Sequence, residues 1–399
     1  MMMLPKEYIQ RMQEQLGSEF SAYLAAMKEP SGRSIRINTL RASVERAKEL
    51  LGVTKSNGVV AQGFMATDEL DGKNVYHACG LYYIQEASAQ LPASLLDVKK
   101  GMAVLDLCAA PGGKSTQLAA YLGGTGVLVA NEIVPKRAQI LTSNIERMGI
   151  TNAIVTNMTP RELCSKLHGC FDAVLVDAPC AGEGMFRKDE RAILEWSREH
   201  VLSCADRQRE ILSSAQTALK DGGRLVYSTC SFSKEENEDV ASWFVDKYPE
   251  FELVETRRLY PHNSKGEGQF AAVFIKRGIL SQSTLLDEQK RTLPDGRELI
   301  IPKTPFRLDG LHIIRAGLLV GEQRNKVFVP SHAMAMADRL DNRVELCQSE
   351  MTSYLHGEVI FKQADRGWCT MRYNGFPLGL GKSTFEGIKN HLPKGLLLM

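Results

Sequence analysis

The 399-residue sequence lacks the features that mark several broad classes of protein. No apolar run is long enough to cross a membrane, and the first residues, Met1 to Glu7, place no basic segment before an apolar one, as a secretory signal would. No block of like charges suggests a tail, and a formal net charge of +2 argues neither for nor against a nucleic-acid partner. We therefore expect a cytoplasmic protein of two or three domains that does not bind membranes.

Cysteine is present, but not in the spacings that form disulfide frameworks or metal sites. The nine cysteines are irregularly spaced, and none forms a Cys-x-x-Cys pair. This pattern argues against a zinc site and favours a reduced protein, so we expect no metal. Most of the thiols are expected to be small buried hydrophobic side chains. That prediction covers Cys79, Cys164, Cys170, Cys204, Cys347 and Cys369.

The two remaining cysteines each follow an apolar, strand-like run. Cys180 stands in the segment Asp177-Ala-Pro-Cys-Ala-Gly, and Cys230 stands in Tyr227-Ser-Thr-Cys-Ser. In open α/β sheets the carboxyl ends of the strands are where ligands bind and reactions occur. Two thiols at two such ends predict a site that uses one as the nucleophile and the other as a helper.

From residue 101 onward the pattern alternates between strands and helices. Apolar runs predict strands over 103–108, 126–130, 153–156, 172–176 and 223–228. Helical periodicity predicts helices over 114–122, 136–148, 201–219 and 235–248. The segments 251–254 and 270–275 are expected to close the sheet as a pair. The predicted fold class is therefore α/β, with a mostly parallel sheet that is covered on both faces.

The flanking regions have different patterns. A helix over 5–28, a strand over 34–38 and a helix over 44–51 predict a small α+β region at the N-terminus. A break at 278–284 precedes a helical segment around 332–340 and a small β-rich module. The short strands expected in this part cover 317–321, 326–330, 357–361, 367–373 and 376–380. The predicted domains are 1–85, 86–278, 284–340 and 341–399.

The loop between the first strand and the first helix of the α/β region carries the most specific local signal. It reads Asp106-Leu-Cys-Ala-Ala-Pro-Gly-Gly-Lys-Ser-Thr116. A P-loop needs a glycine where Cys108 stands, and the sequence has no dinucleotide fingerprint G-x-G-x-x-G. A Pro-Gly-Gly loop suits a ligand without a phosphate chain, such as S-adenosylmethionine. Glu132, just past the second strand, is expected to bind both ribose hydroxyls, and Asp177 to close the site.

Three ordered motifs, at residues 106–116, 177–184 and 227–231, resemble the signature motifs of the Fmu/Sun family of RNA (cytosine-5)-methyltransferases. Further matches resemble the RsmF branch, which modifies small-subunit ribosomal RNA, and extend the resemblance over nearly the whole chain. They are Arg36-Ile-Asn38, Tyr82 to Ser88, Gly182 to Asp189, Tyr260-Pro-His262, Gly266-Glu-Gly268, Arg366-Gly-Trp368 and Asn390 to Gly395. The resemblance implies a Rossmann-like S-adenosylmethionine-dependent methyltransferase sheet and a PUA-like C-terminal module.

The resemblance also implies roles for single residues. Cys230 of the Thr-Cys motif would be the nucleophile and Cys180 of the Pro-Cys motif would aid product release, whereas in DNA cytosine methyltransferases the Pro-Cys cysteine attacks. Asp177 would hydrogen-bond the cytosine, and Lys114 would help to deprotonate a thiol or to lower its pKa. Cofactor contacts are implied for Cys108, Ala109, Ala110, Pro111, Gly112, Gly113, Lys114, Glu132, Arg137 and Asp177.

One departure from the family pattern concerns the adenine side of the cofactor. Many members carry an acidic residue after the third strand, where this chain has Asn157 and Thr159. Neither residue is therefore assigned a contact with the cofactor.

Several residues are candidates for holding RNA. Arg187, Lys188 and Arg191 fit either phosphate contacts or an ordinary charged helix start. In the predicted C-terminal module, interleaved aromatic and basic residues suit base stacking and backbone contacts, although for any single aromatic a place in the core is the simpler interpretation. This set contains Trp368, Arg372, Tyr373 and Lys382.

The chemistry of the two thiols agrees with the resemblance. Carbon 5 of cytosine is a weak nucleophile, and a thiolate that adds to C6 makes C5 reactive enough to take a methyl group. We therefore expect a monomeric enzyme that transfers methyl from S-adenosylmethionine to C5 of a cytosine in RNA, with 16S ribosomal RNA preferred, through a covalent Cys–C6 adduct. The alternatives are a tRNA cytosine-5 methyltransferase and a non-catalytic RNA-binding or ribosome assembly protein that keeps the fold.

Overall fold

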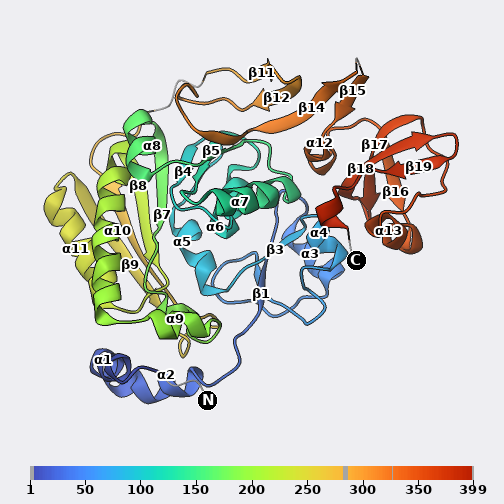
Figure 1. Cartoon of the computed structure of the whole chain (residues 1–399). Coiled ribbons are helices and arrows are strands. Elements are labelled where there is room, and N and C mark those ends of the chain that lie inside the picture. The colour runs from blue at the N-terminus through green and yellow to red at the C-terminus, as the bar shows by residue number, and fades with distance from the viewer. Residues whose placement is uncertain (1–3, 282–285, 326, 398–399) are drawn as a thin grey trace.

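The computed structural model describes residues 4–281, 286–325 and 327–397. Figure 1 shows a central sheet with helices on both sides, a blue N-terminal region below it and a red C-terminal module beside it. The structure confirms the expected α/β class. The expected break at 278–284 and the start of the predicted domain at 284 fall partly outside the described residues.

The chain begins with two short helices where we expected one helix over 5–28. Helix α1 (Lys6–Leu16) ends at Gly17, which has a φ of +51°, and a 3₁₀ turn η1 (Gly17–Glu19) leads into α2 (Phe20–Ala26). The single-helix prediction was wrong because glycine adopts a positive φ at little cost and ends the helix, although the apolar spacing continues past it.

A small antiparallel sheet follows, in agreement with the expected α+β region. Its strands lie in the order β2 (Gly63–Met65), β1 (Ser34–Ile37) and β3 (Tyr82–Ile84). The expected helix is α3 (Val44–Leu51), which Ser43 caps and Gly52 ends in the left-handed conformation. A single turn of helix, α4 (Val75–Ala78), leads into β3.

The central sheet has eight strands in the order β13-β6-β5-β4-β7-β8-β10-β9. The parallel strands are β4 (Ala103–Asp106), β5 (Val127–Asn131), β6 (Ala153–Thr156), β7 (Phe171–Asp177) and β8 (Leu219–Thr229). The expected closing pair is β9 (Phe251–Leu259) and β10 (Gln269–Lys276), with β10 antiparallel to β8 and β9. The strand order reverses around β4, and such a switch point opens a crevice at the carboxyl ends of the strands.

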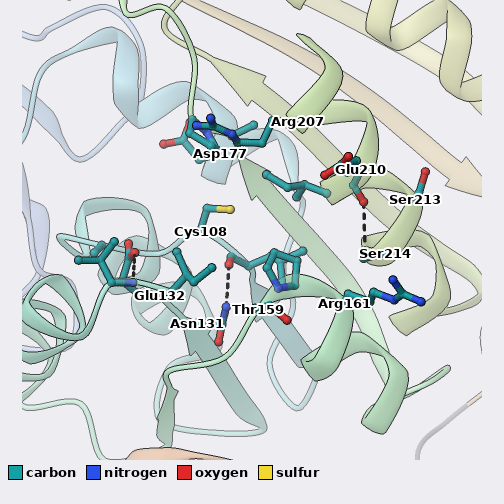
Figure 2. A pocket seen from close by; sticks show the side chains of 18 of the residues that line it. Cys108, Asn131, Glu132, Thr159, Arg161, Asp177, Arg207, Glu210, Ser213 and Ser214 are labelled. Carbon is teal, nitrogen blue, oxygen red and sulfur yellow. Dashed lines mark hydrogen bonds between the residues drawn. The ribbon is translucent and has the colours of Figure 1, made fainter. Parts of the chain in front are cut away.

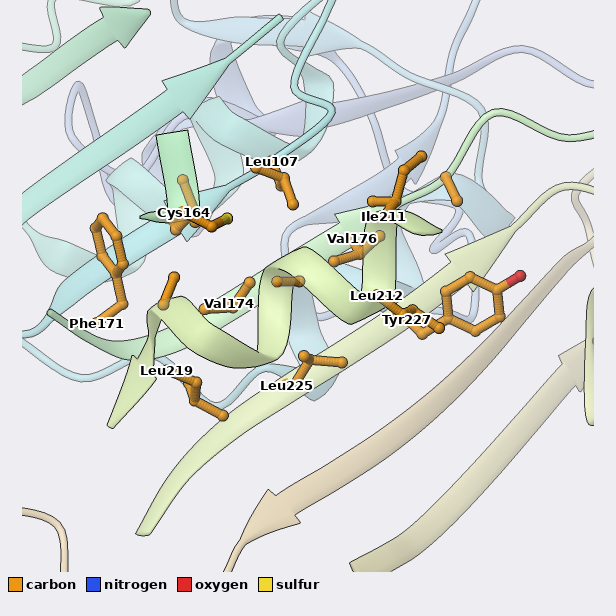
Figure 3. Packing of buried hydrophobic residues seen from close by; sticks show 14 of the residues in the cluster. Leu107, Cys164, Phe171, Val174, Val176, Ile211, Leu212, Leu219, Leu225 and Tyr227 are labelled. Carbon is orange, nitrogen blue, oxygen red and sulfur yellow. The ribbon is translucent and has the colours of Figure 1, made fainter. Parts of the chain in front are cut away.

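Helices cover both faces of this sheet. One face carries α5 (Leu91–Leu95), α6 (Gly113–Leu122) and α7 (Pro135–Arg147), and the other carries α8 (Pro160–Lys166), α10 (Arg198–Ala218) and α11 (Glu238–Lys247). Burial on both sides explains why the parallel strands read as continuous apolar runs. Figure 3 shows one of the two cores, in which Leu212 of α10 packs with Val176 of β7 and Tyr227 of β8. We did not predict the short helix α8.

The segment after β10 contributes to the central sheet as well as forming its own. Strand β13 (Ile313–Ala316) pairs antiparallel with β6, so that Ile313 lies opposite Thr156. The separate sheet contains β11 (Gln289–Thr292), β12 (Arg297–Ile301), β14 (Leu318–Arg324) and β15 (Val327–Pro330). The last two are the strands expected over 317–321 and 326–330, although Lys326 lies outside the described residues. The helix expected over 332–340 is α12 (His332–Met336), which ends earlier.

The C-terminal module packs against the N-terminal region. Its elements are β16 (Arg343–Leu346), α13 (Gln348–Leu355), β17 (Gly367–Tyr373), β18 (Phe376–Thr384), β19 (Gly387–Asn390) and η5 (Lys394–Leu396). Ile35 of β1 and Tyr354 of α13 belong to one buried cluster, and the hydroxyl of Tyr76 accepts a 2.7 Å hydrogen bond from Asn374 Nδ2. The strand expected over 357–361 was wrong, because Ile360 makes a single isolated bridge with Ile388. The domain limits themselves stay predictions.

We predict that Leu212→Ala lowers the free energy of unfolding by about 2–5 kcal/mol, because it leaves a cavity where a fully buried side chain packs against two strands. The matched control is Leu202→Ala on the same helix, where the side chain is 46% exposed and we expect a change below about 0.5 kcal/mol. Denaturant unfolding monitored by circular dichroism measures both. Equal losses in the two variants would contradict the packing described.

Candidate active site

A cleft of about 1380 Å³ opens at the carboxyl ends of β4, β5, β7 and β8 (Figure 2). It lies where the strand order of the sheet reverses, as expected for a ligand site in this class of fold. The predicted site residues among its lining are Cys108, Ala110, Glu132, Arg137, Asp177, Cys180 and Cys230. The cleft thus brings together residues that lie up to 122 positions apart in the sequence, from Cys108 to Cys230.

The two thiols lie next to each other at one end of the cleft. Strands β7 and β8 are adjacent and parallel, with Asp177 opposite Ser228, so the residues just past their ends meet. Sγ of Cys180 and Sγ of Cys230 are 3.3 Å apart, and both cysteines are free and partly buried. The register of one strand pair therefore builds a two-sulfur site.

The two sulfurs share a hydrogen bond, which sets the protonation of Cys180. The pKa of Cys180 is raised well above its ordinary value, first by this hydrogen bond to Cys230, then by burial and by the charge of Cys230. Cys180 therefore keeps its proton in the resting protein.

Asp177 and Lys114 form an ion pair beside the thiols. Nζ of Lys114 lies 2.7 Å from Oδ2 of Asp177, whose Oδ1 accepts hydrogen bonds from Ser228 Oγ at 2.7 Å and Gln269 Nε2 at 3.3 Å. Burial alone would lower the pKa of Lys114, but the carboxylate of Asp177 outweighs it and raises the pKa above its usual value. Lys114 is therefore an ammonium group, which favours stabilising a thiolate over accepting a proton from a thiol.

The loop 108–113 connects β4 to α6 with a tight turn. Gly112 has a φ of +115°, which favours glycine, and α6 begins at Gly113. The backbone of the loop is fixed from three sides, by the bonds Ala109 N to Asn131 O at 2.8 Å, Arg137 Nη2 to Ala110 O at 2.8 Å and Arg36 Nη1 to Gly113 O at 2.5 Å. Behind it, burial raises the pKa of Asp106 to about 7, and Ser115 Oγ donates to that carboxyl at 2.6 Å.

Glu132 lies at the end of β5, where its carboxylate lines the cleft (Figure 2). Its Oε1 accepts a 2.9 Å hydrogen bond from the backbone N–H of Val134, while Oε2 lies 3.5 Å from Arg137 Nη1. A carboxylate oxygen has further lone pairs, so the group can still accept from two ribose hydroxyls. Together with the apolar lining by Leu107 and Ile133, these residues fit an adenosine-bearing ligand without a phosphate chain, such as S-adenosylmethionine.

Asn157 and Thr159, where the chain departs from the family pattern, make hydrogen bonds with the backbone. Asn157 Nδ2 donates to the carbonyl oxygens of Glu132 at 2.6 Å and Ile133 at 2.9 Å. Thr159 caps α8 through a capping box with Glu162 and also lines the cleft. Thr159 and the neighbouring Pro160 both line the cleft at this point.

Several residues that we considered for RNA binding have structural partners instead. The side chain of Arg187 is only 8% exposed and pairs with Glu267 at 2.6 Å. In the C-terminal module, Tyr373 packs on Tyr76, and Arg372 lies 3.7 Å from an oxygen of Asp338. Other candidates remain at the surface or close to it. They are Lys188, Arg191, Trp368 and Lys382.

Sequence reasoning missed a group of buried polar residues directly behind the thiols. Glu183, Gln208 and Glu236 are at most 1% exposed, and their hydrogen bonds join the two cysteine-bearing loops. The signal available in the sequence was that Glu183 and Glu236 stand three and six residues after the two cysteines. The burial prediction was wrong for Cys347, which is exposed as the N-cap of α13.

Within the described residues, no helix is long and apolar enough to cross a membrane. In the same part of the chain, no three His, Cys, Asp or Glu side chains are grouped so that they could hold a metal ion.

Four family models together match almost the whole chain. They are the 16S rRNA methyltransferase RsmB/F over 93–275, the N-terminal domain of 16S rRNA methyltransferase RsmF over 4–87, the RsmF rRNA methyltransferase first C-terminal domain over 276–337 and the methyltransferase RsmF PUA domain over 341–398. The last match confirms the predicted PUA-like module.

Similar proteins and structures agree with these matches. Ribosomal RNA small subunit methyltransferase F from Enterobacter sp. (strain 638) is 32% identical over 98% of this chain and 96% of its own, and that from Aliivibrio salmonicida is 33% identical over 99% and 98%. A methyltransferase homologue from Pyrococcus horikoshii is 31% identical, with a TM-score of 0.62 over 68% of this chain and 95% of that chain. NSun6 from the same organism, solved with SFG, is 22% identical and shares the fold, with a TM-score of 0.60 over 69% and 99%. The chain therefore belongs to the RsmF family of 16S rRNA methyltransferases.

Proposed function

We propose that this S-adenosylmethionine-dependent enzyme methylates carbon 5 of a cytosine in small-subunit ribosomal RNA through a covalent bond between Cys230 and C6 of the base. The observation that supports the proposal is the pair of sulfurs 3.3 Å apart, beside a half-buried ion pair and in a cleft that fits the cofactor. A binding protein without catalysis has no need for two adjacent thiols in such a place.

Binding of the base comes first. A cytosine inside a helix is unreachable, so the target has to be single-stranded or flipped out into the cleft. The carboxylate of Asp177 accepts from the exocyclic amine of the base, and Ser228, Gln269 and Lys114 hold that carboxylate in place. When bound, S-adenosylmethionine supplies an electrophilic methyl group.

Cys230 acts next. Its thiolate forms a bond to C6 of the ring, and the electrons of the C5–C6 double bond move so that C5 becomes the nucleophile. The ammonium group of Lys114 stabilises the negative sulfur before the attack, since an opposite charge nearby favours the thiolate. The neighbouring Cys180 stays protonated at this stage.

Cys180 acts after the methyl transfer. Its pKa is raised mainly by the sulfur of Cys230, and that sulfur is no longer a charged partner once it is bonded to carbon. The Cys180 thiol then loses its proton to water more readily, and the resulting thiolate takes the proton from C5. The electron pair of the C5–H bond restores the double bond and expels Cys230 as a thiolate, which frees the product.

We expect Cys230→Ala to abolish methyl transfer from labelled S-adenosylmethionine to small-subunit ribosomal RNA, while Cys347→Ala, a change at an exposed cysteine, leaves it intact. The reaction needs a sulfur that bonds to C6, and alanine cannot form that bond. The assay is run in parallel with transfer RNA. If Cys230→Ala were active and Cys180→Ala inactive, Cys180 would be the nucleophile and Cys230 the release group. If the enzyme methylated transfer RNA in preference to small-subunit ribosomal RNA, the proposed substrate would be wrong.

Cys180→Ala is expected to accumulate a protein–RNA adduct that survives denaturing electrophoresis, and to slow multiple turnover by about 10²-fold or more, because the C5 proton loses its base. The double variant Cys180→Ala/Cys230→Ala is the control and should give no adduct. If the single variant forms no band of higher mass, Cys180 does not act in release.

Glu132→Ala should weaken binding of S-adenosylhomocysteine by ~30-fold, or about 2 kcal/mol, because the ribose hydroxyls lose a charged acceptor. Isothermal titration calorimetry measures the affinity. Lys136→Ala on the first turn of α7 provides a control at a nearby exposed position. Unchanged affinity in Glu132→Ala would remove this residue from the cofactor site.

A further inference from the structure

A buried polar cluster lies directly behind the two catalytic thiols. Its members are Glu183, Gln208, Ser231 and Glu236, and none is more than 1% exposed. Within the described part of the chain, neither carboxyl group has a lysine, arginine or histidine within ion-pair distance. Two buried carboxyl groups without a cation are costly unless hydrogen bonds or protons compensate their charge.

The cluster forms hydrogen bonds with the backbone on both sides of Cys180. Gln208 Nε2 donates to the carbonyl oxygen of Pro179 at 3.0 Å, and the backbone N–H of Ala181 donates to Glu236 Oε2 at 3.0 Å. The same Gln208 nitrogen donates to Glu236 Oε2 at 2.8 Å, which ties the two contacts together. The position of the Cys180 thiol therefore depends on Glu236.

The same cluster holds the loop that carries Cys230. Ser231 Oγ lies 2.6 Å from Glu236 Oε1 and 3.1 Å from Glu183 Oε2. Glu183 Oε2 also accepts a 2.6 Å hydrogen bond from the backbone N–H of Phe232. The carboxyl groups thus link the loop after β7 to the loop after β8, and so fix the position of the Cys180 sulfur relative to that of Cys230.

The hydrogen bonds of Ser231 indicate where the cluster carries a proton. Ser231 Oγ has one hydrogen and two lone pairs, accepts from the backbone N–H of Ser233 at 3.2 Å, and contacts both carboxyl groups. Its hydrogen can serve one carboxyl group, which would leave the other facing a lone pair. Glu183 Oε1 already accepts hydrogen bonds from Trp196 Nε1 at 2.8 Å and Ser233 Oγ at 2.7 Å, as an ionised carboxylate does. A proton on Glu236 therefore completes the chain, since Glu236 then donates to Ser231 and Ser231 donates to Glu183.

We propose that Glu236 is a neutral carboxylic acid and the positioning residue that holds Cys180 against Cys230, so that it controls release of the methylated product. The inference rests on the covalent mechanism proposed above. Glu236 does not touch the base; it acts through the N–H of Ala181 and the hydroxyl of Ser231.

The electrostatic surroundings of Glu236 agree with a bound proton. Burial raises its pKa to about 7, and the nearby charge of Glu183 raises it too, while the hydrogen bonds from Ser231, Gln208 and Ala181 lower it. The titratable groups near it include Glu183, Cys180, Tyr227 and Cys204, while Arg207 and Arg209 of α10 act on the last two and form no ion pair with Glu236 in the described chain. Below neutral pH the proton is therefore retained.

The test compares Glu236→Gln with Glu236→Ala. A glutamine amide mimics a protonated carboxyl group: its oxygen accepts from Ala181 and Gln208, and its NH₂ donates to Ser231. We expect Glu236→Gln to release product within about threefold of the unchanged enzyme, and Glu236→Ala to slow release about tenfold or more, the scale of one lost buried hydrogen bond. Asp239→Asn, three residues further along at an exposed position, makes the same change of charge and should have no effect.

Two measurements distinguish release of the methylated product from methyl transfer. A single-turnover assay follows methyl transfer, and denaturing electrophoresis follows the fraction of covalent protein–RNA complex at steady state. Glu236→Ala should keep transfer close to normal and accumulate the complex, as Cys180→Ala does. Binding of S-adenosylhomocysteine verifies that the variant folds. Ser231→Ala removes the bridging oxygen and repeats the test if Glu236→Ala does not fold.

The outcomes are distinguishable from those of the proposed function. If Cys180→Ala itself forms no adduct, the release role fails and the inference fails with it. If Cys180→Ala forms the adduct but Glu236→Ala and Ser231→Ala turn over normally, the covalent mechanism stands and Glu236 is not the positioning residue. An accumulated adduct in Glu236→Gln would show that Glu236 acts as an ionised carboxylate, which overturns the neutral-acid assignment.

Discussion

The pairing of β7 with β8 is the constraint on which the site depends. Two neighbouring parallel strands end at the same edge of the sheet, and with Asp177 opposite Ser228 their next few residues place two sulfurs 3.3 Å apart. A shift of register by one residue would turn one thiol to the other face of the sheet. The contact with the sulfur of Cys230 raises the pKa of Cys180, which therefore keeps its proton.

Contacts from the surrounding structure fix this edge of the central sheet. The ion pair between Lys114 and Asp177 ties the cofactor loop to the end of β7, and Arg36 reaches from the N-terminal sheet to the same loop. The C-terminal module shares a buried cluster with that N-terminal region. In Figure 1 α3 and α4 of the N-terminal region lie next to the C-terminal module, whereas α1 and α2 lie below the central sheet.

Much of the fold could be predicted from the sequence because parallel strands buried on both faces leave long apolar runs. The short motifs after the strands also carried the chemistry, since a thiol or carboxylate at a strand end is seldom needed for packing. Long-range pairing left no such signal: nothing in the short run of β13 predicts that it joins β6, and nothing near Arg187 predicts its buried partner Glu267. Glu183 and Glu236 look like solvated charges in the sequence, and their burial follows from how two distant loops meet.

The bond between Cys230 and the pyrimidine ring is the central claim, and trapping tests it most directly. A fluorine at C5 replaces the proton that has to leave, so an RNA that carries 5-fluorocytosine at the target should stay attached to the enzyme after methyl transfer. Digestion and mass spectrometry of the attached peptide then identify the cysteine. The account predicts an adduct on Cys230; an adduct on Cys180, or on neither cysteine, would contradict it.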